Sequence, residues 1–407
     1  MNTRTWICCQ LGAREHYAIP RALHGQGALD WFITDAWMPP KNPLGAIERG
    51  LRERYHADLA GAQVKAWNAK LILFELQARS RRLSGWPLII ARNRWFQSKV
   101  VAALARLPMS DFRSANSDRK SQPVLFSYSY TALEPFRWAK SHGWRTVLGQ
   151  IDPALIAERI VQKLHDTGSG VCSHWEPAPP EYWDRWRAEC ALADRIIVNS
   201  TWSREALESE GIPGEKITVI PLAYTPPAEA IGFQREYPAT FTSERPLRVL
   251  FLGQVNLLKG IAPALDAVRL LANEPVEFRF VGPRQMTVPA DLQNAGPVGW
   301  TGPVSRKQTP DFYRWADVFL FPTLSDGFGL TQLEAQAWKL PVICSRYCGD
   351  VVNDGANGLR LDEVSGESIA SALRRLLSEP WLVRSLAQNS GIGTKFSLEA
   401  FGEALQA

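Results

Sequence analysis

The sequence predicts an α/β protein built from two Rossmann-like, doubly wound domains that face each other across a cleft. Three observations support this prediction. Short apolar runs alternate with helix-like patterns in both halves of the 407 residues, which is typical of parallel sheets flanked by helices. A turn-rich stretch over residues 221–246 separates the two halves. The chain is also long enough for two cores of ordinary size.

The first half opens with a strand, a turn and a helix. We expect the strand over residues 5–9, the turn at Gly12 and a helix that runs through Leu23. Later in this half, Ser200 has the residue type that caps a helix, and that helix is expected to run to about Glu210, before Gly211. The other strands of the first half are expected over residues 29–34, 124–127, 145–149, 195–199 and 217–221.

The second half repeats the alternation after the turn-rich stretch. Strands are expected over residues 248–253, 277–281, 317–321 and 341–344, with a further short strand at 296–301. Helices are expected over residues 261–272, 310–315, 330–339 and 365–377, and a terminal helix follows Pro380 and runs through Ala407. Two such domains in tandem place a cleft between the carboxyl ends of their sheets, where proteins of this class bind ligands.

These elements divide the chain into a first domain over residues 1–222, a connection over 223–245 and a second domain over 246–390. Residues 391–407 form a C-terminal helix, for which we consider packing against the first domain. An irregular, basic insert is expected over residues 38–122, and two interpretations of it stay open. It is either a solvated helical face that covers the domain core or an amphipathic surface at an anionic membrane. Both depend on Arg79, Arg81, Arg82, Trp86, Ile89, Ile90, Arg92, Arg94, Trp95, Phe96, Lys99, Arg106, Arg113, Arg119 and Lys120.

Composition narrows the class of protein. A net charge of +5 favours anionic partners, but no nucleic-acid-binding module is recognisable, so we expect no nucleic-acid partner. The six Cys are scattered without metal-binding spacing, which favours a reduced, cytoplasmic protein with no bound metal. No apolar run approaches the roughly 18 residues of a membrane span. We therefore expect a cytoplasmic protein, either free or peripheral at the inner face of the membrane.

One segment combines a phosphate site with two carboxylates. It is the run SDGFGLTQLE at residues 325–334, which follows an apolar strand and opens a helix. Gly327 and Gly329 let the backbone approach a ligand closely, while Asp326 and Glu334 stand on either side of the helix start. In the simplest alternative, Asp326 only caps the helix and Glu334 lies on its surface. The N–H groups assigned to an anion site are those of Phe328, Gly329, Leu330 and Thr331.

This segment resembles the Glu-x7-Glu region of the family 4 glycosyltransferases, which have the GT-B fold. The resemblance continues through the runs LPVI at 340–343, CGD at 348–350 and NDGANG at 353–358. It extends backwards through FYRWAD at 312–317, WTGPV at 300–304 and FLGQVNLLKG at 251–260. In the first half it includes GARE at 12–15, ADRIIVNS at 193–200 and EKITVIP at 215–221. It therefore covers nearly the whole chain, is weak in 38–122 and is specific in 248–358.

The resemblance implies a retaining hexosyltransferase that needs no metal or other cofactor. Such an enzyme moves a hexose from a nucleoside-diphosphate sugar to an acceptor hydroxyl in glycan or glycoconjugate synthesis. The acceptor is a carbohydrate, a lipid-linked saccharide or another hydroxyl compound, and the first domain binds it. The resemblance also implies that the departing diphosphate takes the proton of the acceptor, so that no side-chain nucleophile is required.

The roles of individual residues follow from the same resemblance. Lys259 neutralises the diphosphate, Glu334 binds the ribose hydroxyls, and Asp326 binds the donor hexose. Val304 faces the base through its main chain, and Gly12 approaches the phosphates from the opposite domain when the cleft closes. A solvated loop lysine is the alternative for Lys259. The remaining positions of the donor site are Gly253, Gln254, Gly327, Phe328, Gly329, Leu330 and Thr331.

Three positions depart from the pattern of the family. The first Glu of the motif is Asp326, which is one methylene shorter. An Arg is expected at the position of Gln254, so one cationic partner of the diphosphate is missing. Many members also carry a His near the sugar, after a strand of the first domain. Here Gln150 and Asp152 are the candidates for its place as catalytic residues, although Asp152 is equally suited to cap a helix.

Three other functions stay open at the level of sequence. A glycoside hydrolase would use Asp326 and Glu334 as its two carboxyl groups, but a phosphate cradle between them then has no role. An epimerase acting on nucleotide sugars would share the donor site. A catalytically impaired homologue would keep the fold as a binding or scaffold partner, in line with Gln254 and the missing His. The sequence does not define the base, the hexose, the acceptor or the oligomeric state.

Overall fold

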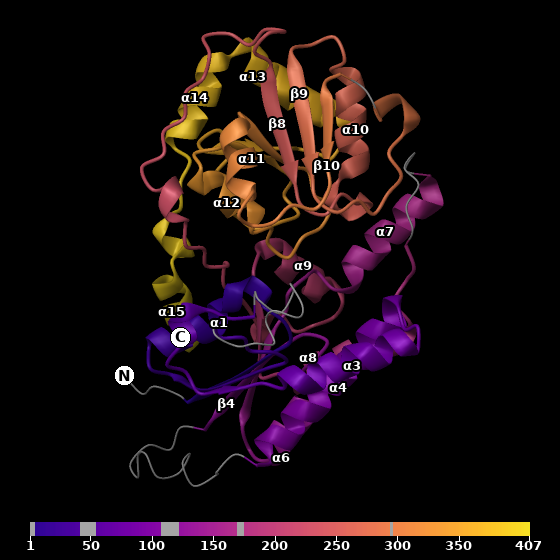
Figure 1. The fold of residues 1–407 in the computed structure, drawn as a ribbon, viewed down its shortest axis with the longest axis vertical. Helices are drawn as coiled ribbons and strands as arrows, with labels where there is room; N and C mark the ends of the chain where they lie inside the picture. Colours follow the sequence, from indigo (N-terminus) through magenta and orange to yellow (C-terminus); the bar gives the residue numbers. More distant parts are fainter. Residues whose placement is uncertain (1–4, 41–53, 107–121, 169–174, 294–295) are drawn as a thin grey trace.

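The computed structural model describes residues 5–40, 54–106, 122–168, 175–293 and 296–407. These ranges form two α/β domains that lie one above the other along the longest axis of the molecule (Figure 1). Each domain has a parallel sheet, with seven strands in the first and six in the second. The predicted fold class, two doubly wound domains, is confirmed.

Short apolar runs form most of these strands, and most are buried, as expected for parallel sheets covered by helices on both faces. The first sheet contains β1 (Trp6–Gln10), β2 (Leu29–Thr34), β3 (Val64–Lys65), β4 (Val124–Tyr128), β5 (Arg145–Gly149), β6 (Arg195–Val198) and β7 (Ile217–Val219). The second contains β8 (Leu247–Leu252), β9 (Val276–Val281), β10 (Val298–Thr301), β11 (Val318–Phe321), β12 (Val342–Cys344) and β13 (Gly358–Arg360).

The strand order creates a switch point in each sheet. The first sheet has the order β3-β2-β1-β4-β5-β6-β7, and the second has the order β10-β9-β8-β11-β12-β13. The chain leaves β1 toward one edge and returns on the other side with β4, and it does the same around β8 and β11. Ligands of open α/β sheets bind beyond the carboxyl ends of the strands at such points. The topology alone therefore indicates where a site lies in each domain.

The insert over residues 38–122 is not irregular as expected, because its described part contains two long helices. Helix α4 buries Phe96, Val100 and Leu104 in the core of the first domain and packs on α6, so it is a helical face that covers this core. Three of the basic residues considered above, Arg113, Arg119 and Lys120, lie outside the described residues. The helices of the domain are α1 (Ala18–Gly25), α3 (Asn68–Ser80), α4 (Gly85–Leu104), α6 (Leu133–Ser141), α7 (Leu155–Thr167), α8 (Pro180–Leu192) and α9 (Thr201–Ser209).

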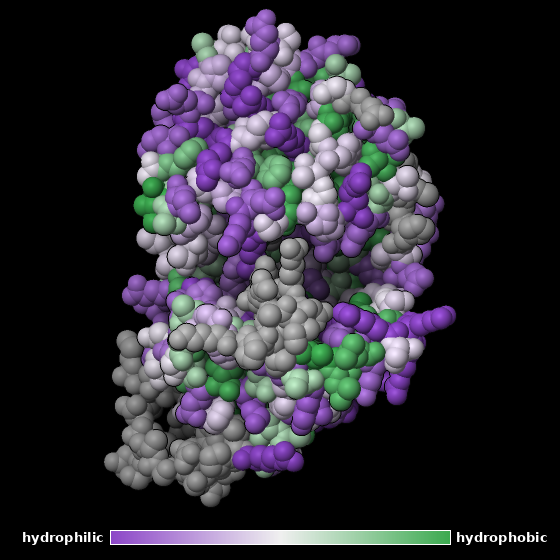
Figure 2. All heavy atoms as spheres, viewed as in Figure 1, coloured by the Kyte–Doolittle hydropathy of each residue, from purple (hydrophilic) through white to green (hydrophobic). Residues whose placement is uncertain are grey.

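The outer side of the α3–α4 pair is partly apolar. Figure 2 shows hydrophobic residues gathered over these helices, with hydrophilic residues beside them. Leu73 and Leu76 on α3 are 55% and 54% exposed, whereas Trp95 of α4 packs against Phe74 with ring centroids 5.4 Å apart. In the ranges that the structure describes, no helix is both long enough and apolar enough to span a bilayer.

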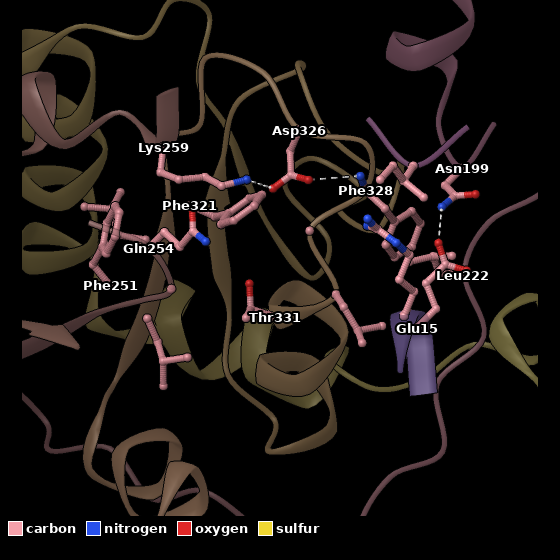
Figure 3. Close-up of a pocket in the computed structure, with 17 residues that line it drawn as sticks. Glu15, Asn199, Leu222, Phe251, Gln254, Lys259, Phe321, Asp326, Phe328 and Thr331 are labelled. Atoms are coloured by element: carbon pink, nitrogen blue, oxygen red, sulfur yellow. Dashed lines mark hydrogen bonds and ion pairs between the residues drawn. The ribbon is translucent and has the colours of Figure 1, made fainter. Parts of the chain in front are cut away.

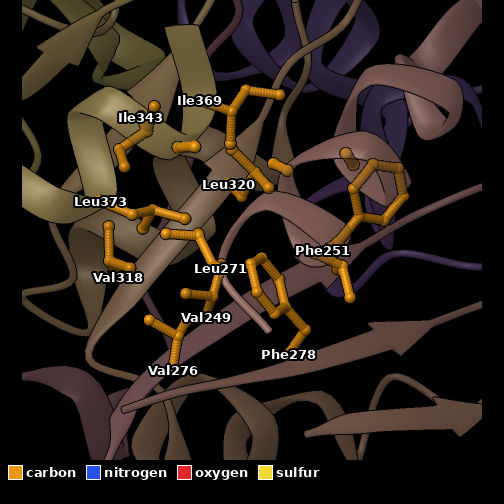
Figure 4. Close-up of a cluster of buried hydrophobic side chains, with 14 of the residues drawn as sticks. Val249, Phe251, Leu271, Val276, Phe278, Val318, Leu320, Ile343, Ile369 and Leu373 are labelled. Carbon is orange, nitrogen blue, oxygen red and sulfur yellow. The ribbon is translucent and has the colours of Figure 1, made fainter. Parts of the chain in front are cut away.

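The core of the second domain lies between its sheet and helices α10 and α13 (Figure 4). Val249 and Phe251 of β8 and Val318 of β11 pack with Ile369 and Leu373 of α13 in one buried cluster. This packing makes the sheet a rigid support for the loops that leave its carboxyl edge. The helices of the domain are α10 (Ile261–Leu270), α11 (Thr309–Trp315), α12 (Thr331–Ala337), α13 (Gly366–Ser378) and α14 (Pro380–Gln388).

The end of the chain forms two helices, not the single terminal helix that was expected. Helix α14 ends at Gln388, and α15 (Leu398–Gln406) begins after Ser397, whose side chain accepts a hydrogen bond from the Ala400 N–H at 3.1 Å. The break lets α15 return to the first domain, where it packs on α1 (Figure 1). There the Arg195 guanidinium donates to the carbonyl of Leu405 at 2.9 Å. The chain thus connects the two domains twice.

The domains touch where helix α9 begins. The indole N–H of Trp202 donates to the Ser325 hydroxyl at 3.0 Å, and the Ser203 hydroxyl donates to the carbonyl of Gly327 at 3.2 Å. A Cβ atom at Gly327 would lie 2.1 Å from the carbonyl oxygen of Ile151, so only glycine allows this approach. These contacts hold the two carboxyl edges close together.

Candidate functional site

A cavity of 370 Å³ lies between the two domains at the carboxyl ends of strands from both sheets (Figure 3). The first domain contributes residues that follow β1, β5, β6 and β7, and the second contributes the ends of β8 and β11 and the loops after them. It therefore lies where the two switch points face each other. Its walls are formed by Arg14, Glu15, Ile151, Asn199, Leu222, Phe251, Leu252, Gly253, Gln254, Lys259, Leu320, Phe321, Asp326, Phe328, Gly329, Leu330 and Thr331.

Backbone N–H groups before and at the start of α12 provide donors on one wall of this cavity. Among the described residues, none accepts a hydrogen bond from the N–H of Gly329, Leu330 or Thr331. Gly329 has φ +80°, and a Cβ there would lie 2.4 Å from the Phe321 ring. The N–H of Phe328 was expected to bind the ligand too, but it donates to Asp326 Oδ1 at 3.2 Å. Three of the four expected donors are therefore available to an anion.

Lys259 and Asp326 form an ion pair beside these N–H groups (Figure 3). The Lys259 ammonium contacts Oδ2 of Asp326, while Oδ1 accepts the bond from Phe328. The two residues belong to different loops, one after β8 and one after β11, which lie side by side because β8 and β11 are neighbouring strands. The pair places a positive and a negative group together at the edge of the anion site.

The loop after β8 is held in shape by Asn256. Its side-chain oxygen accepts a hydrogen bond from the Lys259 N–H at 3.0 Å, which fixes the short 3-10 turn over Leu257–Lys259. Its amide donates to Gln285 at 2.8 Å and lies 3.4 Å from the Gln254 side-chain oxygen. Gly253, Gln254 and Lys259 of this loop all line the cavity, where the resemblance to the family led us to expect them.

Glu334 lies on α12 but is not one of the described residues that line the cavity. Its Oε2 accepts a hydrogen bond from the Tyr313 hydroxyl at 2.7 Å. Burial raises the pKa of the Glu334 carboxyl, while this hydrogen bond and the charge of Arg306 partly oppose the rise. A two-carboxylate hydrolase requires both carboxyl groups to face one common space. Asp326 and Glu334 do not have this arrangement, because only Asp326 lines the cavity.

The side chains of Gln150 and Asp152 form hydrogen bonds to other residues of the protein. The side chain of Gln150 is buried, accepts from the Trp186 indole at 2.9 Å and donates to Asp152 Oδ1 at 3.0 Å. That same oxygen of Asp152 accepts from the Tyr130 hydroxyl at 2.6 Å and from the Ala154 N–H at 2.9 Å. Asp152 thus fastens the turn before α7, although it also lines two cavities next to the main one.

Gly12 and Val304 lie outside the main cavity. The N–H of Gly12 donates to Asp35 Oδ1 at 3.0 Å, and its carbonyl accepts from the Gln10 side chain at 3.0 Å. It lines a neighbouring groove in the first domain. Val304 is half-buried and packs on an apolar cluster of the second domain. In this arrangement of the domains, neither residue lines the cavity that contains the N–H groups at the start of α12.

Three polar residues of the cavity wall were not given roles by the sequence, namely Arg14, Glu15 and Asn199. The Glu15 carboxylate accepts from the Tyr128 hydroxyl at 2.7 Å. It also accepts from the Asn199 amide at 3.0 Å (Figure 3). Burial raises the pKa of Glu15, and these two hydrogen bonds partly oppose the rise. The runs GARE at 12–15 and ADRIIVNS at 193–200 were the signals in the sequence for this corner of the site, and neither showed that the two segments meet.

A second cavity of 300 Å³ adjoins the first, and both are lined by Lys259 and Asp326. Aromatic rings dominate the side of this cavity that the first domain provides. Tyr182 stacks on Tyr130 with ring centroids 4.8 Å apart, and Trp86 lies against Tyr182 at 4.9 Å. Aromatic faces with carboxylates beside them suit a ligand with both apolar and hydroxyl surfaces. The aromatic residues in the wall are Trp86, Tyr130, Trp175, Tyr182 and Trp183.

Comparison with known sequences points to one family. The family described as glycosyl transferases group 1 matches residues 246–379. A D-inositol 3-phosphate glycosyltransferase of Kineococcus radiotolerans is 30% identical over 309 residues, which are 67% of this chain and 68% of the relative. Its namesake in Acidothermus cellulolyticus is 32% identical over 224 residues, 49% of either chain. The O-antigen chain mannosyltransferase B of Escherichia coli is 28% identical over 328 residues, 71% of this chain and 82% of that protein.

Solved structures show the same fold at low sequence identity. The catalytic domain of starch synthase IV from Arabidopsis thaliana, bound to ADP and acarbose, has a TM-score of 0.63 at 13% identity and covers 99% of this chain and 98% of its own. HepE of Anabaena in complex with UDP-glucose has a TM-score of 0.57 at 14% identity, with 98% coverage of both chains. The chain spans about half the length of curated relatives such as the Acidothermus cellulolyticus protein. With its two-domain GT-B fold, the chain belongs to the group 1 glycosyltransferases.

Proposed function

We propose that this protein transfers a hexose from a nucleoside-diphosphate sugar to an acceptor hydroxyl, with retention of anomeric configuration and without a metal. The reaction serves glycan or glycoconjugate synthesis. One observation carries the proposal: the cavity between the domains joins Lys259 to the unengaged N–H groups of Gly329, Leu330 and Thr331. Such a set of donors suits the diphosphate of a sugar nucleotide.

In the proposed reaction, the diphosphate leaves from the same face on which the acceptor arrives. The bond between the anomeric carbon and the diphosphate oxygen breaks, and the bond to the acceptor oxygen forms. The acceptor proton passes to the departing diphosphate oxygen, so the atoms balance without a side-chain base. Lys259 and the N–H groups stabilise the charge that grows on the diphosphate. The contacts between the domains exclude water from the reacting atoms.

The donor lies along the second domain in this proposal. Its diphosphate contacts Lys259 and the start of α12, and its hexose reaches Asp326. Its ribose lies beside Glu334, and its base lies near the main chain of Val304. Because Glu334 is partly covered in the structure, we propose that donor binding opens the space beside it and that closure brings Gly12 toward the phosphates.

We place the acceptor in the aromatic cavity that adjoins the donor cavity. Both cavities reach Lys259 and Asp326, so a hydroxyl in one lies next to a hexose in the other. Tryptophan and tyrosine faces pack on the apolar faces of sugar rings, which favours a carbohydrate or the saccharide of a lipid-linked acceptor.

A rate measurement separates this function from its alternatives. The protein is incubated with UDP-glucose, ADP-glucose and GDP-mannose, each with a panel of saccharide acceptors, and released nucleoside diphosphate is measured. We expect release that depends on both donor and acceptor. Conversion of the donor into an epimer would show an epimerase, and donor binding without turnover across the panels would indicate an impaired homologue with a binding role.

We further propose a cytoplasmic protein that touches the inner face of the membrane through α3. Leu73 and Leu76 are exposed on this helix, and Arg79, Arg81 and Arg82 follow at its end. Apolar side chains beside basic ones suit an anionic lipid surface. Flotation with anionic liposomes should exceed flotation with neutral ones, and Leu73→Ser/Leu76→Ser should reduce it. Equal flotation with both lipids would contradict the contact.

A further inference from the structure

Arg14 is a cation of the first domain that lines the donor cavity together with Lys259 and Gln254 of the second. It is exposed at this position, on the short 3-10 turn that follows β1. Lys259 and Gln254 lie across the cavity on the loop after β8. The cavity therefore has positive side chains from both domains.

The backbone around Arg14 is held firmly. The buried side chain of Gln10 donates to the carbonyl of Gly12 at 3.0 Å and to that of Arg14 at 2.9 Å. The next residues, Glu15, His16 and Tyr17, all have positive φ, at 49°, 52° and 61°. Non-glycine residues adopt such values in succession only where the surrounding structure enforces them. The backbone of Arg14 is therefore held in a fixed position at the cavity wall.

The charges around Arg14 leave its guanidinium available. Lys259 is already paired with Asp326, so its charge is partly neutralised before a donor arrives. Glu15, the carboxyl next in sequence, is hydrogen-bonded to Tyr128 and Asn199. Within the ranges that the structure describes, no carboxylate forms an ion pair with Arg14. An arginine at an anion site, with no carboxylate of its own, is suited to bind phosphate oxygens.

We propose that Arg14 supplies the second positive charge to the donor diphosphate, from the domain opposite Lys259. This inference rests on the proposed function and deepens it. Arg14 would replace the cationic partner of the diphosphate that is missing at Gln254, on the loop that carries Lys259. It also makes the diphosphate a bridge between the domains, because its two cationic partners come from different sheets. Domain closure and charge stabilisation then occur together.

The test compares nucleotides that differ by one phosphate. UDP, ADP and GDP are titrated against UMP, AMP and GMP by calorimetry with four proteins: wild type, Arg14→Gln, Arg14→Gln/Gln254→Arg and Arg187→Gln. Arg187 pairs with Asp184 on α8 and serves as the matched arginine control. We expect Arg14→Gln to weaken diphosphate binding about 10-fold or more, the range of a charged hydrogen bond, and monophosphate binding much less. Arg187→Gln should bind like wild type.

The double variant makes the test specific. If Arg14 acts through its charge on the diphosphate, an arginine restored on the opposite wall at position 254 should recover most of the lost diphosphate affinity. Unchanged diphosphate binding in Arg14→Gln, equal loss for mono- and diphosphates, or no recovery in the double variant would overturn the inference while leaving the proposed function in place. Failure of the wild type to bind any diphosphate would instead reject the proposed function and this inference with it.

Discussion

Lys259 and Asp326 neutralise each other at the edge of the donor cavity. The resemblance to the family assigns one of them to the diphosphate and the other to the hexose, yet in the structure each is the partner of the other. In the proposed function, donor binding divides the pair: the ammonium turns to phosphate and the carboxylate to sugar hydroxyls. The pair also keeps two charged side chains hydrogen-bonded before the donor arrives.

Asp326→Asn should separate nucleotide affinity from turnover. The amide leaves the Lys259 charge free, so UDP, ADP or GDP should bind about three- to ten-fold more tightly, as expected when a nearby carboxylate is removed from a partly exposed site. Turnover should fall because the hexose loses its carboxylate. Calorimetry and the release assay measure the two effects. Asp291→Asn is the control, because Asp291 is exposed, pairs with Arg269 and does not line the cavity. Weaker nucleotide binding in Asp326→Asn would contradict the shared role of the pair.

Gly327→Ala should impair activity more than stability. A Cβ at this position lies 2.1 Å from the Ile151 carbonyl oxygen, so the two domains have to separate locally. A displacement of about 1 Å near reacting groups lowers rates by roughly 100-fold. The melting temperature should change little, because the contact joins two domains and lies outside both cores. Gly25→Ala, where a Cβ meets no atom within 4 Å, should leave both quantities unchanged. Full activity in Gly327→Ala would show that this contact is dispensable.

Removal of metals should leave the transfer reaction intact. In the proposed mechanism, Lys259, the backbone N–H groups and Arg14 stabilise the charge on the diphosphate, so no metal ion is needed. Activity measured after dialysis against EDTA should equal that of the untreated enzyme, and the product should keep the anomeric configuration of the donor by NMR. Loss of activity on chelation, with recovery on adding magnesium or manganese, would mean that Lys259, Arg14 and the N–H groups do not stabilise the diphosphate without a metal ion.

Glu189 should make the stability of the first domain depend on pH. The oxygens of its buried carboxyl group accept hydrogen bonds from the N–H groups of Tyr130, Ala132 and Leu133 at the start of α6. Burial raises the pKa of this group to about 7, against the opposing effect of those bonds. The folded state then holds a proton that the unfolded state has lost, so stability should fall as pH rises from the unfolded value near 4.5 through about 7.

The variant Glu189→Gln isolates this effect, since it keeps an acceptor oxygen and removes the ionisation. The free energy of unfolding in urea should decrease with pH in the wild type relative to the variant, by up to about 1.4 kcal/mol per pH unit in this window. Tryptophan fluorescence follows the transition. Parallel pH profiles of the two proteins would mean that the carboxyl is not protonated in the folded state.

The fold was largely predictable because its main strands are short apolar runs between polar turns. β2 and β5 occur at the expected residues, and most other strands differ by one or two. The sequence missed β3 and β13, which have two and three residues at sheet edges, too few to show a pattern. For residues 38–122 the sequence allowed a helical face over the core but did not give the bounds of α3 and α4, because charged residues interrupt their apolar faces and the packing of α4 on α6 is a tertiary effect.

The part of the site that lies in continuous segments was predictable, and the part assembled by the fold was not. The run at 325–334 is assigned to the site from its glycines and carboxylates, and the loop at 251–260 from its resemblance to the family. Residues of both segments line the cavity. Arg14 and Asn199 join the cavity from distant segments, and the engagement of Phe328 by Asp326 depends on one side-chain rotamer. None of these features leaves a periodic trace in the sequence.

The most direct test of the donor site is the thermal stability of three proteins, namely wild type, Lys259→Ala and Glu334→Ala, with a panel of nucleotide sugars. A ligand at 100 times its dissociation constant adds about 2.7 kcal/mol, which raises the melting temperature by several degrees. We predict this rise in the wild type with one class of nucleotide sugar and its loss in both variants. No rise in the wild type with any nucleotide sugar, or the same rise in all three proteins, would contradict the assignment.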